Sequence, residues 1–197
     1  AHGAYYASHV FNPFFLAGTE TLAYELWEQL GHCGPESVVL PVGNGSLLLG
    51  LYRGFSRLRA AGLVPRLPRL VAVQAAACAP IYHAFHAGHS AVEPAPRGPT
   101  VASGLAIAQP ARGSEILAAL RDTRGTALCV SEEAILETRA ALAWLKRHPA
   151  WYGGCSPPRS PPARAALLSE RRTGAPLAYL PAQPHNRHNN PINLPTA

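Results

Sequence analysis

The sequence predicts an α/β fold: a parallel sheet with helices on both faces, followed by a poorly ordered tail rich in Pro and Arg. First, short apolar segments alternate with amphipathic segments of helical period up to residue 148. Strands that are apolar on both sides are typical of a parallel sheet covered on both faces. Second, ten of the 20 prolines fall in the last 49 residues. We therefore expect an α/β domain over residues 1–148 and an irregular, largely disordered segment over residues 149–197.

The first helix is predicted over residues 18–30. Leucines recur at every fourth position, which places them on one side, and acidic residues occupy other parts of the helix surface. Gly31 and the Gly34-Pro35 pair end the helix. The leucines are Leu22, Leu26 and Leu30, and the acidic residues are Glu20, Glu25 and Glu28.

A strand and a helix follow in direct succession. Residues 38–42 are wholly apolar, which predicts a buried strand. Residues 47–61 predict a helix, in which Gly50 and Gly54 lie four positions apart on one side. Glycines at this spacing allow a neighbouring helix to approach closely.

The middle of the chain predicts a second strand over residues 70–74 and a short helix over residues 80–87. Residues 88–99 contain three prolines and two glycines, which is typical of a loop. A short apolar run over residues 103–108 follows this loop.

The last predicted elements are a helix over residues 114–121, a third strand over residues 127–130 and a helix over residues 134–146. Ser131 is the expected N-cap of the last helix. Two glutamates follow Ser131, and acidic residues at this position suit the helix dipole.

The most informative motif is the turn between the first strand and the second helix, Pro-Val-Gly-Asn-Gly-Ser. A small-residue turn at a helix N-terminus leaves backbone N–H groups free to bind an anion such as phosphate. The motif is neither a nucleoside-triphosphate loop nor a dinucleotide fingerprint. A purely structural turn is the alternative, since Gly and Asn also serve tight turns. The candidate cofactor-binding residues are Gly43, Asn44, Gly45, Ser46 and Leu47.

The charge distribution argues against a nucleic-acid or membrane partner. The net charge is +6, but residues 1–148 hold 12 Lys and Arg against 10 Asp and Glu. Residues 149–197 hold five Arg against Glu170, and this segment lacks interleaved aromatic residues for base stacking. No uninterrupted apolar run reaches the length of a membrane span, about 18 residues.

Cysteine and histidine usage argues against a metal site. The four cysteines lie far apart without a Cys-x-x-Cys pair, which favours a reducing cytoplasm over a disulfide framework. Three histidines at a spacing of three could share a helix face, but a loop begins within the run and no carboxylate lies nearby. A polar surface segment is the favoured interpretation of His83, His86 and His89.

Six short segments, in their order and spacing, resemble threonine synthase. This is a pyridoxal-phosphate enzyme of the tryptophan-synthase-β-like fold, fold type II. The resemblance extends from Ala4 to about Lys146. It therefore covers the predicted α/β domain and not the tail. The segments are Asn12–Glu25, Leu40–Ser46, Pro68–Ala75, Ala79–Pro80, Thr100–Ile107 and Val130–Ile135.

The resemblance implies pyridoxal 5′-phosphate as cofactor, with its phosphate held by backbone amides of the Gly43–Leu47 turn. It further implies conversion of O-phosphohomoserine and water to threonine and phosphate, with the cofactor ring as an electron sink. The partner is thus a small amino-acid substrate, and a homo-oligomer is compatible with the resemblance.

The chain departs from the family in its lysines. The family's Schiff-base lysine lies upstream of the matched segments, and the only lysine here, Lys146, is interpreted as a solvated charge at a helix end. Glu20 stands where the family usually has lysine. We therefore assign no catalytic residue in this chain and expect it to be inactive alone. The alternatives are another fold-type-II lyase, similar to threonine dehydratase or cysteine synthase, and a non-catalytic pseudoenzyme or interaction module.

Overall fold

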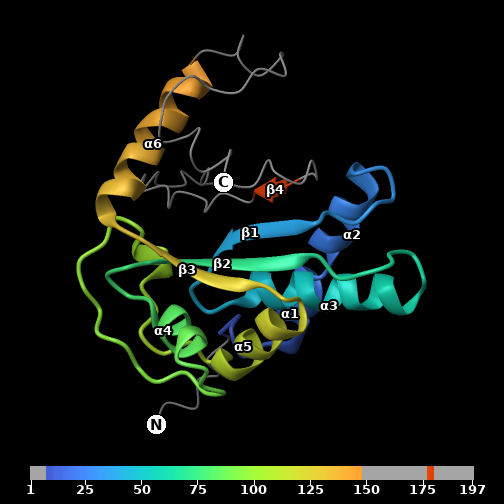
Figure 1. The fold of residues 1–197 in the computed structure, drawn as a ribbon, viewed down its shortest axis with the longest axis horizontal. Helices are drawn as coiled ribbons and strands as arrows, with labels where there is room; N and C mark the ends of the chain where they lie inside the picture. The colour runs from blue at the N-terminus through green and yellow to red at the C-terminus, as the bar shows by residue number, and fades with distance from the viewer. Residues whose placement is uncertain (1–7, 148–176, 180–197) are drawn as a thin grey trace, which may run out of the picture.

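The computed structural model describes residues 8–147 and 177–179, and these residues form a parallel sheet with flanking helices (Figure 1). The strand order is β3-β2-β1-β4, and every neighbouring pair is parallel. The predicted α/β class is therefore confirmed. The strands are β1 (Ser37–Pro41), β2 (Arg69–Ala75), β3 (Thr126–Val130) and β4 (Leu177–Tyr179).

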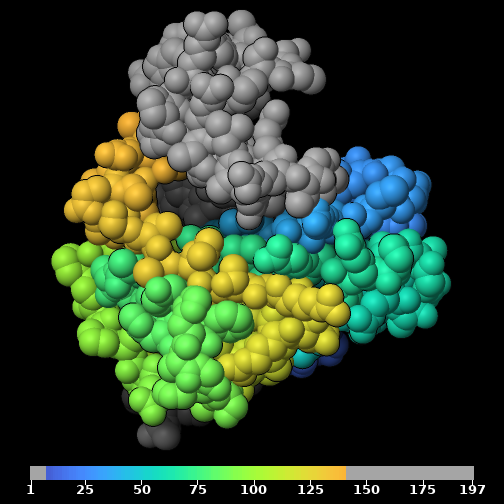
Figure 2. Space-filling view, in the orientation of Figure 1, coloured from blue at the N-terminus to red at the C-terminus, as the bar shows by residue number. Residues whose placement is uncertain are grey.

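Helices α3, α4 and α5 cover one face of the sheet, and α6 leaves the end of β3 on the other side (Figure 1). Helices α1 and α2 form an outer layer on α3, while α4 and α5 adjoin one another on the surface seen in Figure 2. The helices are α1 (Pro13–Thr19), α2 (Thr21–Gln29), α3 (Ser46–Ala60), α4 (Pro80–His86), α5 (Gly113–Asp122), α6 (Glu132–Arg147) and the 3₁₀ turn η1 (Ser103–Leu105).

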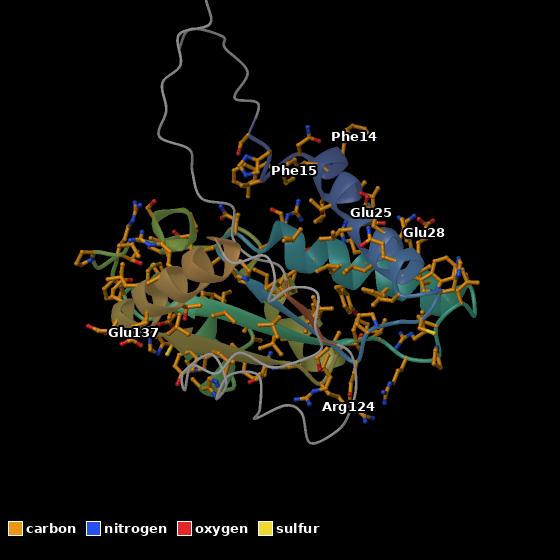
Figure 3. The ribbon with its side chains drawn as sticks, turned by 90° about the horizontal axis from the view of Figure 1, so that it is seen from above. Phe14, Phe15, Glu25, Glu28, Arg124 and Glu137 are labelled. Atoms are coloured by element: carbon orange, nitrogen blue, oxygen red, sulfur yellow. The ribbon has the colours of Figure 1, made fainter. Side chains whose placement is uncertain are left out.

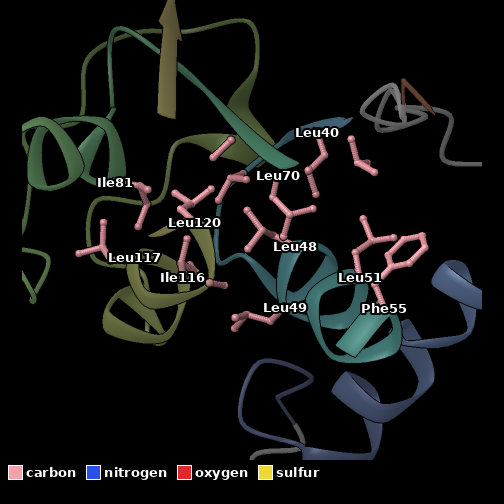
Figure 4. Close-up of a cluster of buried hydrophobic side chains, with 14 of the residues drawn as sticks. Leu40, Leu48, Leu49, Leu51, Phe55, Leu70, Ile81, Ile116, Leu117 and Leu120 are labelled. Carbon is pink, nitrogen blue, oxygen red and sulfur yellow. The ribbon is translucent and has the colours of Figure 1, made fainter. Parts of the chain in front are cut away.

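The core lies between the sheet and helices α3 and α5 (Figure 4). Val38 pairs with Leu70 and Leu40 with Ala72 in the parallel register, so these four side chains project from the same face. All four are fully buried. Opposite them, α3 and α5 contribute the buried side chains Leu48, Leu49, Leu51, Phe55, Ile116, Leu117 and Leu120.

The first helix differs from its prediction because it is two helices. Helix α1 begins at Pro13, where Asn12 is the N-cap and its Oδ1 accepts a hydrogen bond from the N–H of Phe14 at 2.9 Å. Helix α2 follows after a break at Glu20. The Asn-Pro pair was therefore a helix start, since Pro fits the first helical position, where no N–H donor is needed.

The prediction that Glu20 lies on the helix surface is wrong. Its side chain is buried, and its Oε2 lies 2.9 Å from Nε of Arg57 on α3. A buried carboxylate is tolerated only when paired, and Arg57 supplies that pairing from 37 positions away. Glu25 and Glu28 are exposed, as predicted, on the outward side of α2 (Figure 3).

The two glycines of α3 allow the close helix approach that their spacing predicted. A Cβ at Gly54 would lie 2.7 Å from the backbone oxygen of Glu20, and a Cβ at Gly50 would lie 2.7 Å from Cβ of Thr19. Both distances are shorter than van der Waals contact. Helices α1 and α2 therefore reach α3 only because these positions carry no side chain.

Strand β4 (Leu177–Tyr179) is the described part of the segment that was predicted to be largely irregular, and it pairs with β1. The other residues of the predicted tail, 148–176 and 180–197, lie outside the described part of the chain. Among the described residues, no helix is long and apolar enough to cross a membrane.

Candidate functional site

The candidate site lies at the edge of the sheet where the parallel strands β1, β2 and β3 end. Ligands of open parallel sheets bind outside the carboxyl ends of the strands. Three turns start at this edge: residues 42–45 lead into α3, residues 76–79 into α4, and Ser131 into α6. The Gly-Asn-Gly-Ser turn singled out in the sequence is the first of these.

This turn is fixed at both ends by backbone hydrogen bonds. The N–H of Val42 donates to the carbonyl of Val73 on β2 at 2.9 Å. At the other end, Leu49 N–H donates to the Gly45 carbonyl, also at 2.9 Å. Gly45 is the N-cap of α3 in the left-handed conformation, with φ +75°, and it gives no side-chain cap. The backbone is thus held at Val42 and at Leu49, while the N–H groups between these two residues remain available to bind other groups.

Six consecutive backbone N–H groups of this turn donate no hydrogen bond to any acceptor within residues 8–147. Three of them precede α3 and three belong to its first turn. The α3 helix is 15 residues long, so its dipole adds positive potential at the same place. Free N–H groups at a helix N-terminus suit an anion. The six residues are the five predicted site residues, Gly43, Asn44, Gly45, Ser46 and Leu47, and also Leu48.

A side chain would overlap a neighbour at Gly45 and would be in tight contact with neighbours at Gly43. A Cβ at Gly45 would overlap the Cδ1 atom of Ile116 on α5 and lie 2.6 Å from Cγ1 of the same residue. A Cβ at Gly43 would lie 3.2 Å from both the backbone oxygen of Gly104 and Cγ1 of Ile107. The turn is therefore pressed between α5 and the segment around η1.

The segment over residues 98–107 contacts the turns after β1 and β2 and the first residue of α6 after β3, and the sequence did not predict this arrangement. Gly98 N–H donates to the carbonyl of Ala77 at 2.8 Å, after β2. The N–H of Val101 donates to Oε2 of Glu132 at 2.9 Å, after β3. Gly104 lies against the turn after β1, as described above. One segment thus joins the three strand ends into a single edge.

Gln74 is a buried polar residue at this edge to which sequence reasoning assigned no role. Its side chain is fully buried near the end of β2. Its Nε2 donates to the carbonyl of Val42 at 3.1 Å. Its Oε1 accepts from the N–H groups of Ile81 and Tyr82, at 2.9 and 3.1 Å. The only signal available in the sequence was an amide side chain at the end of the otherwise apolar predicted strand over residues 70–74.

The third turn contains the predicted N-cap. Ser131 Oγ accepts a hydrogen bond from the N–H of Ala134 at 3.3 Å, so Ser131 caps α6 as predicted. The backbone N–H of Glu133 itself, and then the Ser131 hydroxyl, lower the pKa of the Glu133 carboxyl below its ordinary value. The start of α6 therefore carries negative charge beside the strand ends.

Of the three histidines spaced three apart, His86 makes the contacts that tie it to the sheet, while His83 and His89 are exposed. His86 lies next to the Tyr82 and Phe85 rings, and its Nε2 lies 2.9 Å from the carbonyl oxygen of Ala127. Within the described part of the chain, no group of three His, Cys, Asp or Glu side chains is arranged to hold a metal ion. Lys146 lies in the last turn of α6, far along the chain from the Gly-Asn-Gly-Ser turn.

Comparison with known proteins gives the family. Residues 1–156 match the protein family described as pyridoxal-phosphate dependent enzyme. The chain is 34% identical over 141 residues to threonine synthase of Methanosarcina acetivorans, which covers 72% of this chain and 35% of that protein. It is 31% identical over 138 residues to threonine synthase of Methanocaldococcus jannaschii, covering 70% and 34%. The chain thus spans about a third of the length of these curated relatives.

Solved structures agree on the fold. The crystal structure of a T.th. threonine deaminase matches 85% of this chain and 51% of its own chain, with a TM-score of 0.58 and 25% identity. A fungal L-serine ammonia-lyase from Rhizomucor miehei matches 62% of this chain and 36% of its own, with a TM-score of 0.51 and 24% identity. Pyridoxal phosphate is the cofactor of the matched family, as the resemblance implied. The chain belongs to the family of pyridoxal-phosphate-dependent enzymes.

Proposed function

We propose that this chain is the cofactor-phosphate-binding part of a threonine synthase, which converts O-phosphohomoserine and water to threonine and phosphate. The observation that carries the proposal is the run of N–H groups from Gly43 to Leu48 at the start of α3, which donate to no acceptor in the described part of the chain. The likeness to threonine synthases over 141 residues supports the choice of reaction.

The residues present fit a phosphate group. The donors are backbone N–H groups at a helix N-terminus, which is the chemistry that phosphate requires. A Cβ at Gly43 or Gly45 would be crowded by neighbours, so both positions favour glycine, whose bare backbone exposes its N–H group to a ligand. Gly43 to Leu47 would therefore hold the 5′-phosphate of pyridoxal phosphate. When bound, this cofactor supplies an electron sink for carbanion chemistry.

The chain alone is not expected to make threonine. A lysine must hold the cofactor and move protons in this chemistry. The only lysine of the chain is Lys146, in the last turn of α6. We propose that the reactive lysine belongs to a further part of a longer protein, and that the present chain contributes cofactor binding. A cytoplasmic location accords with this proposal, since Cys33, Cys78 and Cys129 are free.

A second candidate is elimination of ammonia from a hydroxy amino acid. The likeness to the T.th. threonine deaminase, at 25% identity and a TM-score of 0.58, supports it. The two reactions differ in product: threonine and phosphate in one case, ammonia and an oxo acid in the other.

Cofactor titration tests the proposed phosphate site. We expect the purified chain to bind pyridoxal 5′-phosphate at least about tenfold more tightly than pyridoxal, because several charge-assisted hydrogen bonds to phosphate are lost with the latter. Gly43→Val should abolish the difference, whereas Gly62→Val, beyond the far end of α3, should leave it intact. Equal affinity for the two compounds would overturn the proposal and favour a purely structural turn in a non-catalytic module.

A further inference from the structure

We propose that Gln74 is a positioning residue for the phosphate-binding turn, acting through the Val42–Gly43 peptide. The inference rests on the proposed function for its ligand but on separate contacts for its geometry. Gln74 is fully buried and joins three segments: its own strand β2, the residue before the turn, and the first turn of α4.

The three hydrogen bonds fix the orientation of the Gln74 amide. Oε1 faces two N–H donors, those of Ile81 and Tyr82, while Nε2 faces the carbonyl of Val42. Rotating the amide by half a turn would set donor against donor and acceptor against acceptor. Since α4 holds one end of the amide, the other end presents its N–H to Val42 in one direction only.

Fixing the Val42 carbonyl also fixes the next N–H. No cis peptide bond occurs among the described residues, so the carbonyl of Val42 and the N–H of Gly43 point in opposite directions across one planar peptide. The carbonyl points to the buried Gln74 amide. The Gly43 N–H, the first of the six free donors, therefore points away from Gln74. Gln74 thereby sets the direction of the first donor without touching the ligand.

Backbone hydrogen bonds alone do not fix the direction of the Gly43 N–H. The Val42 N–H is held by the carbonyl of Val73, which fixes the peptide before Val42 but not the one after it. With Gln74 replaced by an apolar residue, the Val42 carbonyl would be buried without its partner, which is costly, and would turn to find another donor. The Gly43 N–H would turn with it.

The test uses Gln74→Leu in the 197-residue chain, with Thr123→Val as the matched control. Thr123 is also buried, and its hydroxyl bonds to α5 and to Leu70 at the opposite end of β2. Hydrogen exchange is measured by NMR, and affinity for pyridoxal 5′-phosphate by calorimetry. In Gln74→Leu we expect faster exchange at Ile81 and Tyr82, which lose their acceptor. We also expect faster exchange at Leu49, whose N–H reports the place of the Gly45 carbonyl.

We further expect Gln74→Leu to weaken pyridoxal 5′-phosphate binding about tenfold while pyridoxal binding is unchanged. Thr123→Val should change neither Leu49 exchange nor the affinity ratio. Gln74→Glu adds a signature that mere loss of stability would not produce. A neutral carboxyl can accept from α4 and donate to Val42, whereas the ionised form cannot donate. Its Leu49 exchange should therefore match wild type at about pH 5 and exceed it at about pH 8.

The outcomes separate the two proposals. If wild type fails to prefer the phosphorylated compound but Leu49 exchange responds to Gln74→Leu, the proposed function fails and the positioning role stands. If Gln74→Leu exposes only Ile81 and Tyr82, with Leu49 exchange and the affinity ratio at their wild-type values, Gln74 merely caps α4 and the positioning role is overturned.

Discussion

Substitution of Gly45 by alanine should strongly destabilise the protein, for two reasons that can be measured separately. Gly45 has φ +75°, and an alanine in the left-handed region costs about 1–2 kcal/mol. Its Cβ would also overlap the Ile116 side chain, and overpacking of this kind costs about 1–3 kcal/mol. The free energy of unfolding should therefore fall by about 2–5 kcal/mol, as measured by urea denaturation.

Gly62→Ala is the matched control at the other end of α3. Gly62 has φ +72°, but nothing lies within 4 Å of the place its Cβ would occupy. Gly62→Ala should therefore lower the free energy of unfolding only by the cost of the left-handed backbone, about 1–2 kcal/mol. The double variant Gly45→Ala with Ile116→Ala removes the overlapping atoms, so it should cost less than the sum of the two single changes. Equal costs for the Gly45 and Gly62 variants would refute the argument from packing.

Two further predictions concern α3. Gly54→Ala should lower the free energy of unfolding, because overlap with the Glu20 backbone costs about 1–3 kcal/mol and outweighs the gain in helix propensity of about 1 kcal/mol. The control is Gly18→Ala in α1, which has open space around it and should be neutral or stabilising. Burial, and then the hydrogen bond from Tyr52 to Asp122, raise the pKa of the Tyr52 phenol. The hydrogen bond of the Tyr52 phenol therefore contributes fully to the free energy of unfolding below the unfolded pKa of about 10, and this contribution is lost as the pH rises further. The stability difference between wild type and Tyr52→Phe, at most about 1 kcal/mol, should therefore shrink above that pH. A pH-independent difference, measured by urea denaturation across this range, would contradict the assignment.

Those parts of the fold that depend on local pattern could be predicted from the sequence. Strand β1, the glycine turn and helix α3 follow directly from an apolar run, a small-residue turn and a helical period. The N-cap role of Ser131 followed in the same way. Each of these depends only on neighbours within a few positions along the chain.

Features that depend on distant residues could not be predicted. Glu20 looks like a surface residue until Arg57 is brought beside it by helix packing. Gln74 looks like an interruption in a strand until the carbonyl of Val42 and the N–H groups of α4 surround it. The crowding of Gly45 depends on Ile116, 71 positions further along the chain. Such contacts arise from the tertiary arrangement, and no local propensity encodes them.

The loop that follows α4 matters for grafting the glycine turn and α3 onto another protein. A short peptide carrying only the glycine turn and α3 would lack the backing of Gly104 and Ile107, and also the tether from Gly98 to Ala77. Grafts onto other scaffolds should therefore carry both stretches together. Insertions are better placed at residues 90–91, which are exposed and lie ahead of these anchoring points, since loop closure entropy grows slowly with length.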